Sequence, residues 1–285
     1  MDSRTRIYGI LGDPVEHSLS PALHNAVFKA RGVNAVYVAF RVIADEFAGA
    51  MEGLKSLGIA GVNITLPHKE QAVFYVDAVP NPAHKAIGAV NTIAVAEGRL
   101  LGFNTDAMGF INDLKARFTE GPEGRMALVL GAGGAARAVC FGLLEAGVQN
   151  LVLHNRSHER GLGLTNYLKQ FYPGRAIRAV QSVTELGREA VDFLVNATSC
   201  GMKPDDPYPV NPDILERTRR VYDLVYAPRR SRLVEEAARR GIPAHGGLGM
   251  LIEQAVAAHR LWFPEADTAC ERALINRLRI GKQCG

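Results

Sequence analysis

A short apolar run that enters a glycine-rich turn constrains the fold of this chain more than any other feature. The run is Ala127-Leu128-Val129-Leu130, the turn is Gly131-Ala132-Gly133-Gly134-Ala135-Ala136, and an amphipathic stretch from Arg137 to Ala146 follows. Four consecutive apolar residues are typical of a parallel strand buried on both faces. A G-x-G-x-x-A pattern between a strand and a helix is the context of a dinucleotide-binding turn, where helix amides face the pyrophosphate. The pattern therefore predicts an α/β domain with a nucleotide site at Gly131, Ala132, Gly133, Gly134 and Ala135; a purely structural glycine turn is the alternative.

The segment after the next apolar run, Leu151-Val152-Leu153, indicates which dinucleotide is bound. An NAD-binding domain usually has an Asp or Glu there, which binds the adenosine ribose hydroxyl. This chain instead has His154-Asn155-Arg156-Ser157, and no acid occurs before Glu159. A guanidinium group binds phosphate oxygens in bidentate fashion, and Ser157 adds a hydroxyl donor. The segment favours NADP over NAD, with a surface arginine in a loop as the alternative.

Two further segments carry groups that can move a proton. Asn63 and Thr65 alternate in a short apolar run before Pro67, so a strand would present both on one face. Lys69 follows on the turn, and a second short run ends at Asp106. If the fold brings Lys69 and Asp106 together, they can transfer a proton on a polyhydroxylated small molecule. The alternative is a buried structural ion pair, which also perturbs titratable groups.

Other polar positions have both a binding and a structural interpretation. Ser18 and Ser20 can hold a carboxylate near a helix start, whereas the structural alternative makes Ser20 the N-cap and Pro21 the first helical residue. Tyr226 follows an apolar run and is either a core aromatic or a substrate ligand. Gly247 lies in a flexible turn where the backbone could approach a nicotinamide closely.

Strands and helices alternate along the rest of the chain, which predicts a mainly parallel sheet. Strands are expected at residues 7–11, 37–40, 61–66, 91–95, 100–103, 193–195 and 220–225. Helices are expected at residues 21–28, 47–57, 108–118 and 250–259, with a hairpin turn at 97–99 and a linker at 120–124.

Composition and charge exclude several classes of function. The 285 residues carry a net charge of +4, and no basic run is interleaved with aromatic residues, so we expect no nucleic-acid partner. The four cysteines form no C-x-x-C pair and have no histidines at metal-ligand spacing, so we expect free thiols and no metal. The absence of a signal-peptide pattern and of a membrane-length apolar run predicts a cytoplasmic protein without a membrane partner.

Taken together, these motifs resemble the shikimate dehydrogenase family over nearly the full length of the chain. Besides the glycine turn, the matching segments are His17-Ser18-Leu19-Ser20-Pro21, Asn63-Ile64-Thr65-Leu66-Pro67-His68-Lys69, Gly88-Ala89-Val90-Asn91-Thr92, Asn104-Thr105-Asp106, Asn155-Arg156-Ser157, Asn196-Ala197-Thr198-Ser199, Tyr222 to Tyr226, and Gly249-Met250-Leu251-Ile252-Glu253-Gln254-Ala255. The resemblance implies two α/β domains with a cleft between them. One is a substrate-binding catalytic domain at residues 1–107, completed by C-terminal helices at 250–285. The other is a Rossmann NADP-binding domain at residues 108–249.

The same resemblance implies an activity and assigns roles to single residues. The activity is the NADP-dependent, reversible reduction of 3-dehydroshikimate to shikimate, a step of aromatic amino acid biosynthesis. Lys69 is the expected proton donor and acceptor, with Asp106 beside it. The expected substrate ligands are Ser18, Ser20 and Tyr226 for the carboxylate and Thr65, Asn91, Asp106 and Gln254 for the ring oxygens. The expected NADP contacts are Gly131, Ala132, Gly133, Gly134, Ala135, Asn155, Arg156, Ser157 and Gly247.

Some positions depart from the family pattern, and two other functions remain open. Ser157 stands where threonine is common, and Leu224 stands where a methionine is often found. The proline-rich segment 77–82 replaces a usual helix, so no contact is assigned to it. The alternatives are a quinate/shikimate dehydrogenase that uses NAD and a non-catalytic sensor of a shikimate-pathway metabolite. We expect a small-molecule substrate and either a monomer or a homodimer.

Overall fold

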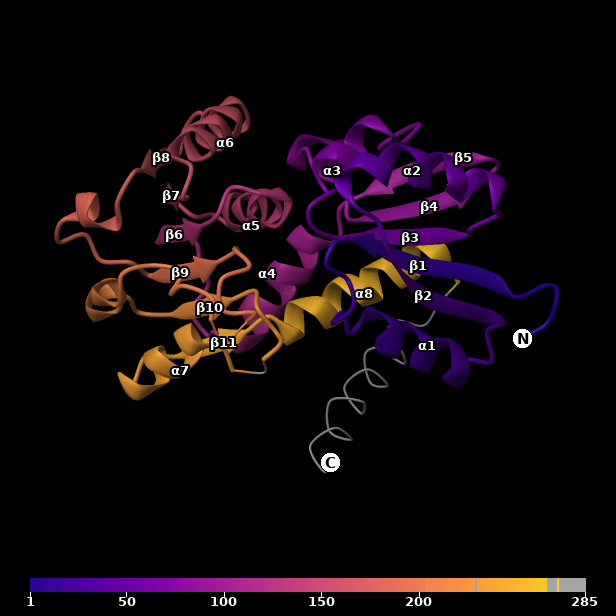
Figure 1. The fold of residues 1–285 in the computed structure, drawn as a ribbon. Helices are drawn as coiled ribbons and strands as arrows, with labels where there is room; N and C mark the ends of the chain where they lie inside the picture. Colours follow the sequence, from indigo (N-terminus) through magenta and orange to yellow (C-terminus); the bar gives the residue numbers. More distant parts are fainter. Residues whose placement is uncertain (204, 229, 266–270, 272–285) are drawn as a thin grey trace. The chain divides into compact units, whose positions relative to one another are not determined.

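The computed structural model describes residues 1–203, 205–228, 230–265 and 271. The chain divides into two compact units, Met1–Thr105 with Ile252–Gly285 and Asp106–Leu251. Each unit is built on its own sheet (Figure 1). Apart from residue 271, the expected C-terminal helical part beyond residue 265 lies outside the described residues, as do Cys270 and Cys284.

A five-stranded sheet forms the base of the first unit. Its strands are β1 (Arg6–Gly12), β2 (Ala35–Arg41), β3 (Gly61–Ile64), β4 (Thr92–Ala96) and β5 (Arg99–Phe103), in the order β2-β1-β3-β4-β5. The first three strands of that order pair in parallel, and the last three pair antiparallel. Glu97 and Gly98 between β4 and β5 have positive φ angles of 52° and 72°, as a two-residue hairpin turn requires. The sheet is therefore parallel on one side and a hairpin on the other.

Helices cover both faces of this sheet (Figure 1). The helices are α1 (Ser20–Ala30), α2 (Phe47–Ser56), α3 (Pro82–Ile87) and the last turns of α8 (Leu248–Trp262), with short 3-10 turns η1 (Ala44–Glu46) and η2 (Gln71–Phe74). Phe47, Met51 and Leu54 recur at helical spacing and pack on one face of the sheet. On the other face, Phe28 of α1 and Trp262 of α8 pack around Tyr8 of β1.

One strand of this sheet is shorter than its sequence predicted. The expected strand reached Leu66, but β3 ends at Ile64. The amide of Thr65 still donates to the Leu11 carbonyl, and the chain then turns, because the amide of His68 donates back to the Thr65 carbonyl. Thr65 and Lys69 therefore lie on a loop beyond the strand.

A six-stranded, all-parallel sheet forms the base of the second unit. Its strands are β6 (Met126–Leu130), β7 (Asn150–His154), β8 (Ala176–Val180), β9 (Phe193–Asn196), β10 (Val221–Asp223) and β11 (Ala244–Gly246), in the order β11-β10-β9-β6-β7-β8. Every pairing is parallel. Strand order reverses at β6, as in doubly wound dinucleotide-binding folds, which place ligands at the carboxyl ends of the strands. The expected strands did not include β8, which carries Arg178, or β11, which has three residues and carries His245.

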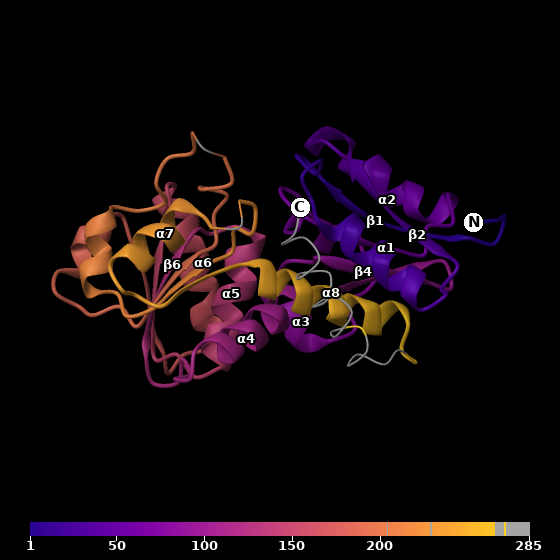
Figure 2. The ribbon, with the colours of Figure 1, turned by 90° about the horizontal axis from the view of Figure 1, so that it is seen from below.

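Helices also cover both faces of the second sheet. They are α4 (Asp106–Arg117), α5 (Gly134–Glu145), α6 (His158–Phe171) and α7 (Arg232–Arg239), with 3-10 turns η3 (Val183–Leu186) and η4 (Pro212–Arg217). Helices α4 and α5 lie side by side (Figure 2), and a Cβ atom on Gly142 would come within 2.8 Å of the Ile111 side chain. On the opposite face, Leu233 of α7 packs with Leu128 and Leu194.

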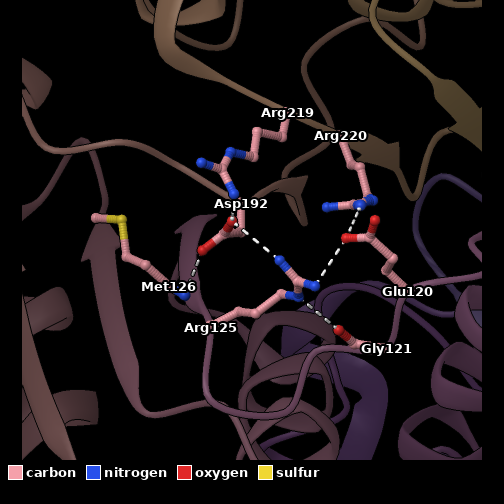
Figure 3. A network of polar contacts seen from close by, with 7 residues as sticks. All are labelled: Glu120, Gly121, Arg125, Met126, Asp192, Arg219 and Arg220. Carbon is pink, nitrogen blue, oxygen red and sulfur yellow. Dashed lines mark hydrogen bonds and ion pairs between the residues drawn. The ribbon is translucent and has the colours of Figure 1, made fainter.

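Ion pairs occupy the amino-terminal edge of this second sheet (Figure 3). Arg125 lies 2.7 Å from Glu120 and 3.6 Å from Asp192. Arg220 also pairs with Glu120, at 2.5 Å, and Arg219 pairs with Asp192, at 3.1 Å. The network joins the segments that enter β6, β9 and β10, so these ion pairs link the amino-terminal ends of three strands.

Candidate functional site

The glycine turn at the carboxyl end of β6 has the geometry of an anion-binding turn. Gly131 has a φ angle of 111°, and its amide donates to the His154 carbonyl over 2.8 Å. A Cβ atom there would lie 3.0 Å from the carbonyl oxygen of Ala197. Gly133 occupies the N-cap position of α5 and offers no side-chain cap, so the first amides of the helix face outward. Ala136 is fully buried, which allows α5 to pack close to β6.

The segment that follows β7 presents Arg156 and Ser157 to solvent. Asn155 shapes this turn, because its side-chain amide donates to the Ser157 carbonyl over 2.8 Å. Ser157 is the N-cap residue of α6, and its side chain makes no capping hydrogen bond. A guanidinium and a hydroxyl thus lie together beside a helix N-terminus, an arrangement suited to a phosphate group.

A buried polar network joins the carboxyl ends of β9 and β10. Asp223 is fully buried, and its carboxylate accepts hydrogen bonds from Asn196 Nδ2 (2.8 Å), the Val225 amide (3.0 Å) and Ser231 Oγ (2.5 Å). Burial raises the pKa of the Asp223 carboxyl to about 6. Asn196 also accepts a bond from the Thr198 hydroxyl over 2.7 Å. The network fixes the two loops that leave this edge of the sheet.

Gly247 is held against the loop that carries Tyr226. The Gly247 amide donates to the Val225 carbonyl over 3.1 Å, and a Cβ atom on Gly247 would come within 2.1 Å of the Leu224 carbonyl oxygen. Because only this residue separates β11 from α8, the expected flexible turn is a single, closely packed residue. Tyr226 itself is half-buried.

Hydrogen bonds join three segments of the first unit that are distant in sequence and contain Lys69, Asn91 and Thr105. The Lys69 carbonyl accepts a bond from the Val90 amide over 2.8 Å. The side chain of Asn91, the next residue, accepts from the Thr105 amide over 2.7 Å and donates to the Thr105 hydroxyl over 2.9 Å. Asp106 follows Thr105 directly, is buried and begins α4. The Asn91 side chain, expected to contact substrate, thus also fixes the residue before Asp106.

The structure does not give Ser20 the capping role of the structural alternative. That alternative made Ser20 the N-cap of α1, and this was wrong: Ser20 is the first helical residue, and Leu19 holds the N-cap position without a side-chain cap. The chain turns earlier than expected, since the Ser18 amide donates to the Val15 carbonyl. The Ser18 hydroxyl then accepts the Ser20 amide over 3.2 Å.

Thr65 and Gln254 complete the expected substrate ligands. Thr65 is half-buried. A Cβ atom on Gly12 would lie only 2.2 Å from the Thr65 methyl carbon. Gly12 thus leaves the space that Thr65 occupies. Gln254 is buried on α8, and the Trp262 indole fixes that helix in the first unit by donating to the Ile93 carbonyl over 3.0 Å.

Three residues near these positions were not singled out from the sequence. They are Thr105, His68 and Asp223, all buried and polar. An aspartate inside the apolar run of β10 was the one available signal for Asp223.

Metal-binding and membrane-spanning features are absent from the described part of the chain. No three His, Cys, Asp or Glu side chains gather there in a way that could hold a metal ion. None of the described helices is long and apolar enough to cross a membrane. Cys140 and Cys200, the described cysteines, are free thiols.

Comparison with known proteins identifies the family. Residues 10–93 match the family model described as the shikimate dehydrogenase substrate binding domain. The chain is 41% identical to a shikimate dehydrogenase (NADP(+)) of Caldanaerobacter subterraneus subsp. tengcongensis, with 93% of this chain and 94% of the relative covered.

Solved structures agree with that match. A shikimate dehydrogenase crystallised with NADP+ has a TM-score of 0.84 and 34% identity, covering 97% of this chain and 96% of the other. The shikimate 5-dehydrogenase of Thermus thermophilus, in complex with NADP(H) and shikimate, has a TM-score of 0.80 and 38% identity over 95% of this chain and 99% of the other. With its two sheets, its glycine turn and relatives of this similarity over most of its length, the chain belongs to the shikimate dehydrogenase family.

Proposed function

We propose that this chain is an NADP-dependent shikimate dehydrogenase that reversibly reduces the ketone of 3-dehydroshikimate to shikimate. The observation that carries the proposal is the hydrogen-bonded path from Lys69 through Val90 and Asn91 to Thr105, the residue before Asp106. This path supports the proposal because it links the segment that carries the Lys69 ammonium group to the residue that precedes the Asp106 carboxylate, the two groups proposed to act in general acid–base chemistry.

The cofactor fits the donor groups at the carboxyl edge of the second sheet. The amides of Gly131 to Ala135 would hold the pyrophosphate, because a helix N-terminus attracts anions. Arg156 and Ser157 would hold the 2′-phosphate, with Asn155 shaping the turn and Gly247 giving close backbone approach. When bound, NADP supplies the hydride that is transferred, and the protein positions it.

Lys69 handles the proton of the reaction. As an ammonium group it polarises the substrate ketone and donates its proton to the oxygen on which negative charge develops. In the reverse direction the neutral amine takes the hydroxyl proton of shikimate. Asp106 hydrogen-bonds the same region of the substrate and holds the reacting oxygen within reach of Lys69.

The remaining proposed ligands bind the carboxylate and the ring oxygens of the substrate. Ser18, Ser20 and Tyr226 hold the carboxylate through hydroxyl donors. The ring oxygens are bound by Thr65, Asn91, Asp106 and Gln254. The hydroxyl and amide side chains of this set can donate and accept hydrogen bonds, and the carboxylate of Asp106 accepts them.

We assign these roles to two domains of the chain. Residues 1–107, completed by 250–285, form the substrate-binding catalytic domain, and residues 108–249 form the NADP-binding domain. Light scattering coupled to size-exclusion chromatography would measure whether the protein is a monomer or a homodimer.

Steady-state rates with four substrate–cofactor pairs test the proposal. Shikimate and quinate are each assayed with NADP+ and with NAD+. We expect the highest kcat/KM with shikimate and NADP+, because Arg156 offers a bidentate partner to the 2′-phosphate. Faster turnover of quinate with NAD+ would support the quinate/shikimate alternative. Binding of shikimate without turnover in any pair would instead indicate a metabolite sensor.

A further inference from the structure

We propose that His68 is a positioning residue for Lys69, because its buried ring fixes the backbone from which the lysine side chain extends. The inference rests on the proposed function, since His68 acts only through Lys69. It touches neither substrate nor cofactor in this assignment.

His68 is the side-chain anchor of the loop that carries Lys69. In the fully described stretch 65–71, His68 is the only buried side chain, with 1% of its surface exposed. The neighbouring Leu66 is 41% exposed, and Lys69 is half-buried. This imidazole is therefore the one buried side chain of the stretch, and it adds to the backbone hydrogen bonds that attach the loop to the first unit.

The imidazole is held by two groups that precede and begin α2. Its plane stacks on the Phe47 ring with centroids 4.3 Å apart and an interplanar angle of 11°. Its Nε2 atom lies 2.6 Å from the Val42 carbonyl oxygen. Because a carbonyl only accepts, Nε2 carries a proton and donates it to the Val42 carbonyl. The buried Nδ1 atom has no hydrogen-bond partner among the described residues.

Backbone hydrogen bonds extend this anchor to both sides of Lys69. The His68 carbonyl accepts from the Ala72 amide over 2.8 Å, and the Lys69 carbonyl accepts from the Val90 amide over 2.8 Å. The Lys69 Cα atom therefore lies between two bonded carbonyl groups. The adjacent His68 ring joins this segment to Val42, which follows β2, and to Phe47 of α2.

Placement of this Cα atom affects catalysis because it is the fixed point from which the lysine side chain extends its ammonium group toward the reacting oxygen. A reacting group displaced by about 1 Å can lower the rate about a hundredfold. A residue that fixes the lysine backbone therefore changes kcat even though it does not touch substrate. A residue that only stabilises the fold changes the amount of active enzyme instead.

A double-mutant cycle separates these two roles. His68→Phe keeps an aromatic ring against Phe47 but removes the donor to the Val42 carbonyl, and it is combined with Lys69→Ala. Active-site concentration is measured by cofactor titration, and kcat and both KM values are determined for all four proteins. We expect His68→Phe alone to lower kcat about tenfold to a hundredfold, with the KM for NADP+ changed less than about twofold.

In the Lys69→Ala background the same substitution should change kcat less than about twofold, because the group it positions is gone. His68→Gln, which retains an N–H donor, should recover part of the lost rate. The matched control is His84→Phe, since His84 is a half-buried histidine on α3 that lies edge-on to Phe103, with centroids 6.0 Å apart. It should leave kcat within about twofold of the wild type.

An equal loss from His68→Phe in both backgrounds, or unchanged kcat in the wild-type background, would overturn the inference. If His68→Phe does not fold, the cycle is run with His68→Gln. An equal loss of kcat from His68→Gln in the wild-type and Lys69→Ala backgrounds would likewise overturn the inference. A wild-type protein without turnover would contradict the proposed function, whereas an active wild type with an additive cycle contradicts only the role of His68.

Discussion

The Asp223 carboxylate accepts a 2.8 Å hydrogen bond from the Asn196 side-chain amide, and both side chains are completely buried. The pair joins the carboxyl ends of β9 and β10, the edge at which doubly wound folds bind ligands. The same carboxylate accepts the Val225 amide, and the Val225 carbonyl accepts the amide of Gly247, a residue proposed to contact the cofactor. Asp223 therefore helps to hold Gly247 in place.

Replacing Asp223 by Asn should have a pH-dependent effect on stability. Burial raises the Asp223 pKa from an ordinary 3.8 to about 6. The folded state therefore holds this proton more tightly than the unfolded state, so the stabilising contribution is full below pH 3.8 and is lost as pH rises through about 6. Asparagine carries no charge, and its amide can face the Ser231 hydroxyl. The free energy of unfolding of Asp223→Asn relative to wild type should rise by about 1.4 kcal/mol between about pH 5 and about pH 8, because roughly half of the full linkage effect is already lost at pH 5.

Urea unfolding at the two pH values measures this difference. Asp205→Asn, at an exposed position of the same unit, is the control and should show no pH-dependent change. A difference between Asp223→Asn and wild type that is equal at both pH values would show that the carboxyl group does not titrate in this range.

Replacing Lys69 by Ala should remove the proton donor and acceptor. We expect kcat to fall by about two to four orders of magnitude, the usual span for losing a general acid–base group. The KM values for shikimate and NADP+ should change far less. Lys85→Ala, an exposed lysine on α3, is the control. Near-normal kcat in Lys69→Ala would mean that this lysine is structural.

Replacing Arg156 by Asp should weaken the use of NADP+ selectively. A carboxylate would then face the 2′-phosphate in place of a bidentate partner. The kcat/KM with NADP+ should fall by at least about tenfold, while that with NAD+ should not fall, because NAD+ has no phosphate there. Arg188→Asp, at another exposed position of the second unit, controls for the change in net charge. Equal losses with both cofactors would indicate that Arg156 acts through the fold.

Features set by neighbouring residues could be predicted from the sequence, and those set by distant partners could not. The turn at Gly131 is encoded locally, since its φ angle of 111° suits glycine and its flanking strand and helix are contiguous. His68 gave no such signal, because Val42, which binds its ring, lies 26 residues away. The same holds for Asp223 and Asn196, which are 27 residues apart.

Two of the differences from expectation concern the boundaries of single elements, the start of α1 and the end of β3. Ser20 fits an N-cap by residue type, but the preceding turn from Val15 to Ser18 starts the helix one residue earlier. The strand expected to reach Leu66 ends at Ile64, because the Thr65 carbonyl accepts the His68 amide in a turn that contains Leu66 and Pro67. Tertiary hydrogen bonds decide such boundaries within one or two residues, which local propensity does not resolve.

Acid should destabilise the first unit through its buried histidine pair. His24 Nδ1 lies 2.8 Å from His259 Nε2. Burial and, secondarily, Arg31 lower the pKa of His259 from 6.5 to about 4, and burial lowers that of His24 as well. Glu271 also faces His259, at 3.5 Å. The unfolded histidines take up protons first, so stability is full above about pH 6.5 and is lost as pH falls toward 4.

The free energy of unfolding of wild type and His259→Gln, measured at about pH 7 and about pH 5, tests this assignment. Wild type should lose more stability than the variant between these pH values, because glutamine does not titrate. The exposed His17 provides the control variant His17→Gln, which should follow the wild type. The same loss in wild type and in His259→Gln would mean that other groups cause the acid sensitivity.

Ser18→Ala and Ser20→Ala should separate substrate binding from helix stability. If both hydroxyls hold the substrate carboxylate, each change leaves a charged group short of one hydrogen bond. This costs roughly 1.5–3 kcal/mol of binding, so the shikimate KM should rise about tenfold to a hundredfold. The KM for NADP+ should stay nearly fixed, because the glycine turn belongs to the other unit.

Their effects on stability should differ, since the Ser18 hydroxyl accepts the Ser20 amide over 3.2 Å and Ser20 makes no capping bond. Ser18→Ala should therefore cost about 1 kcal/mol of unfolding free energy, whereas Ser20→Ala should not. Thermal melts and shikimate kinetics on the same preparations measure both effects, with Ser56→Ala at the exposed end of α2 as the control. If Ser18→Ala melts earlier but binds shikimate normally, its hydroxyl serves the helix start alone, and the carboxylate must be held by other groups.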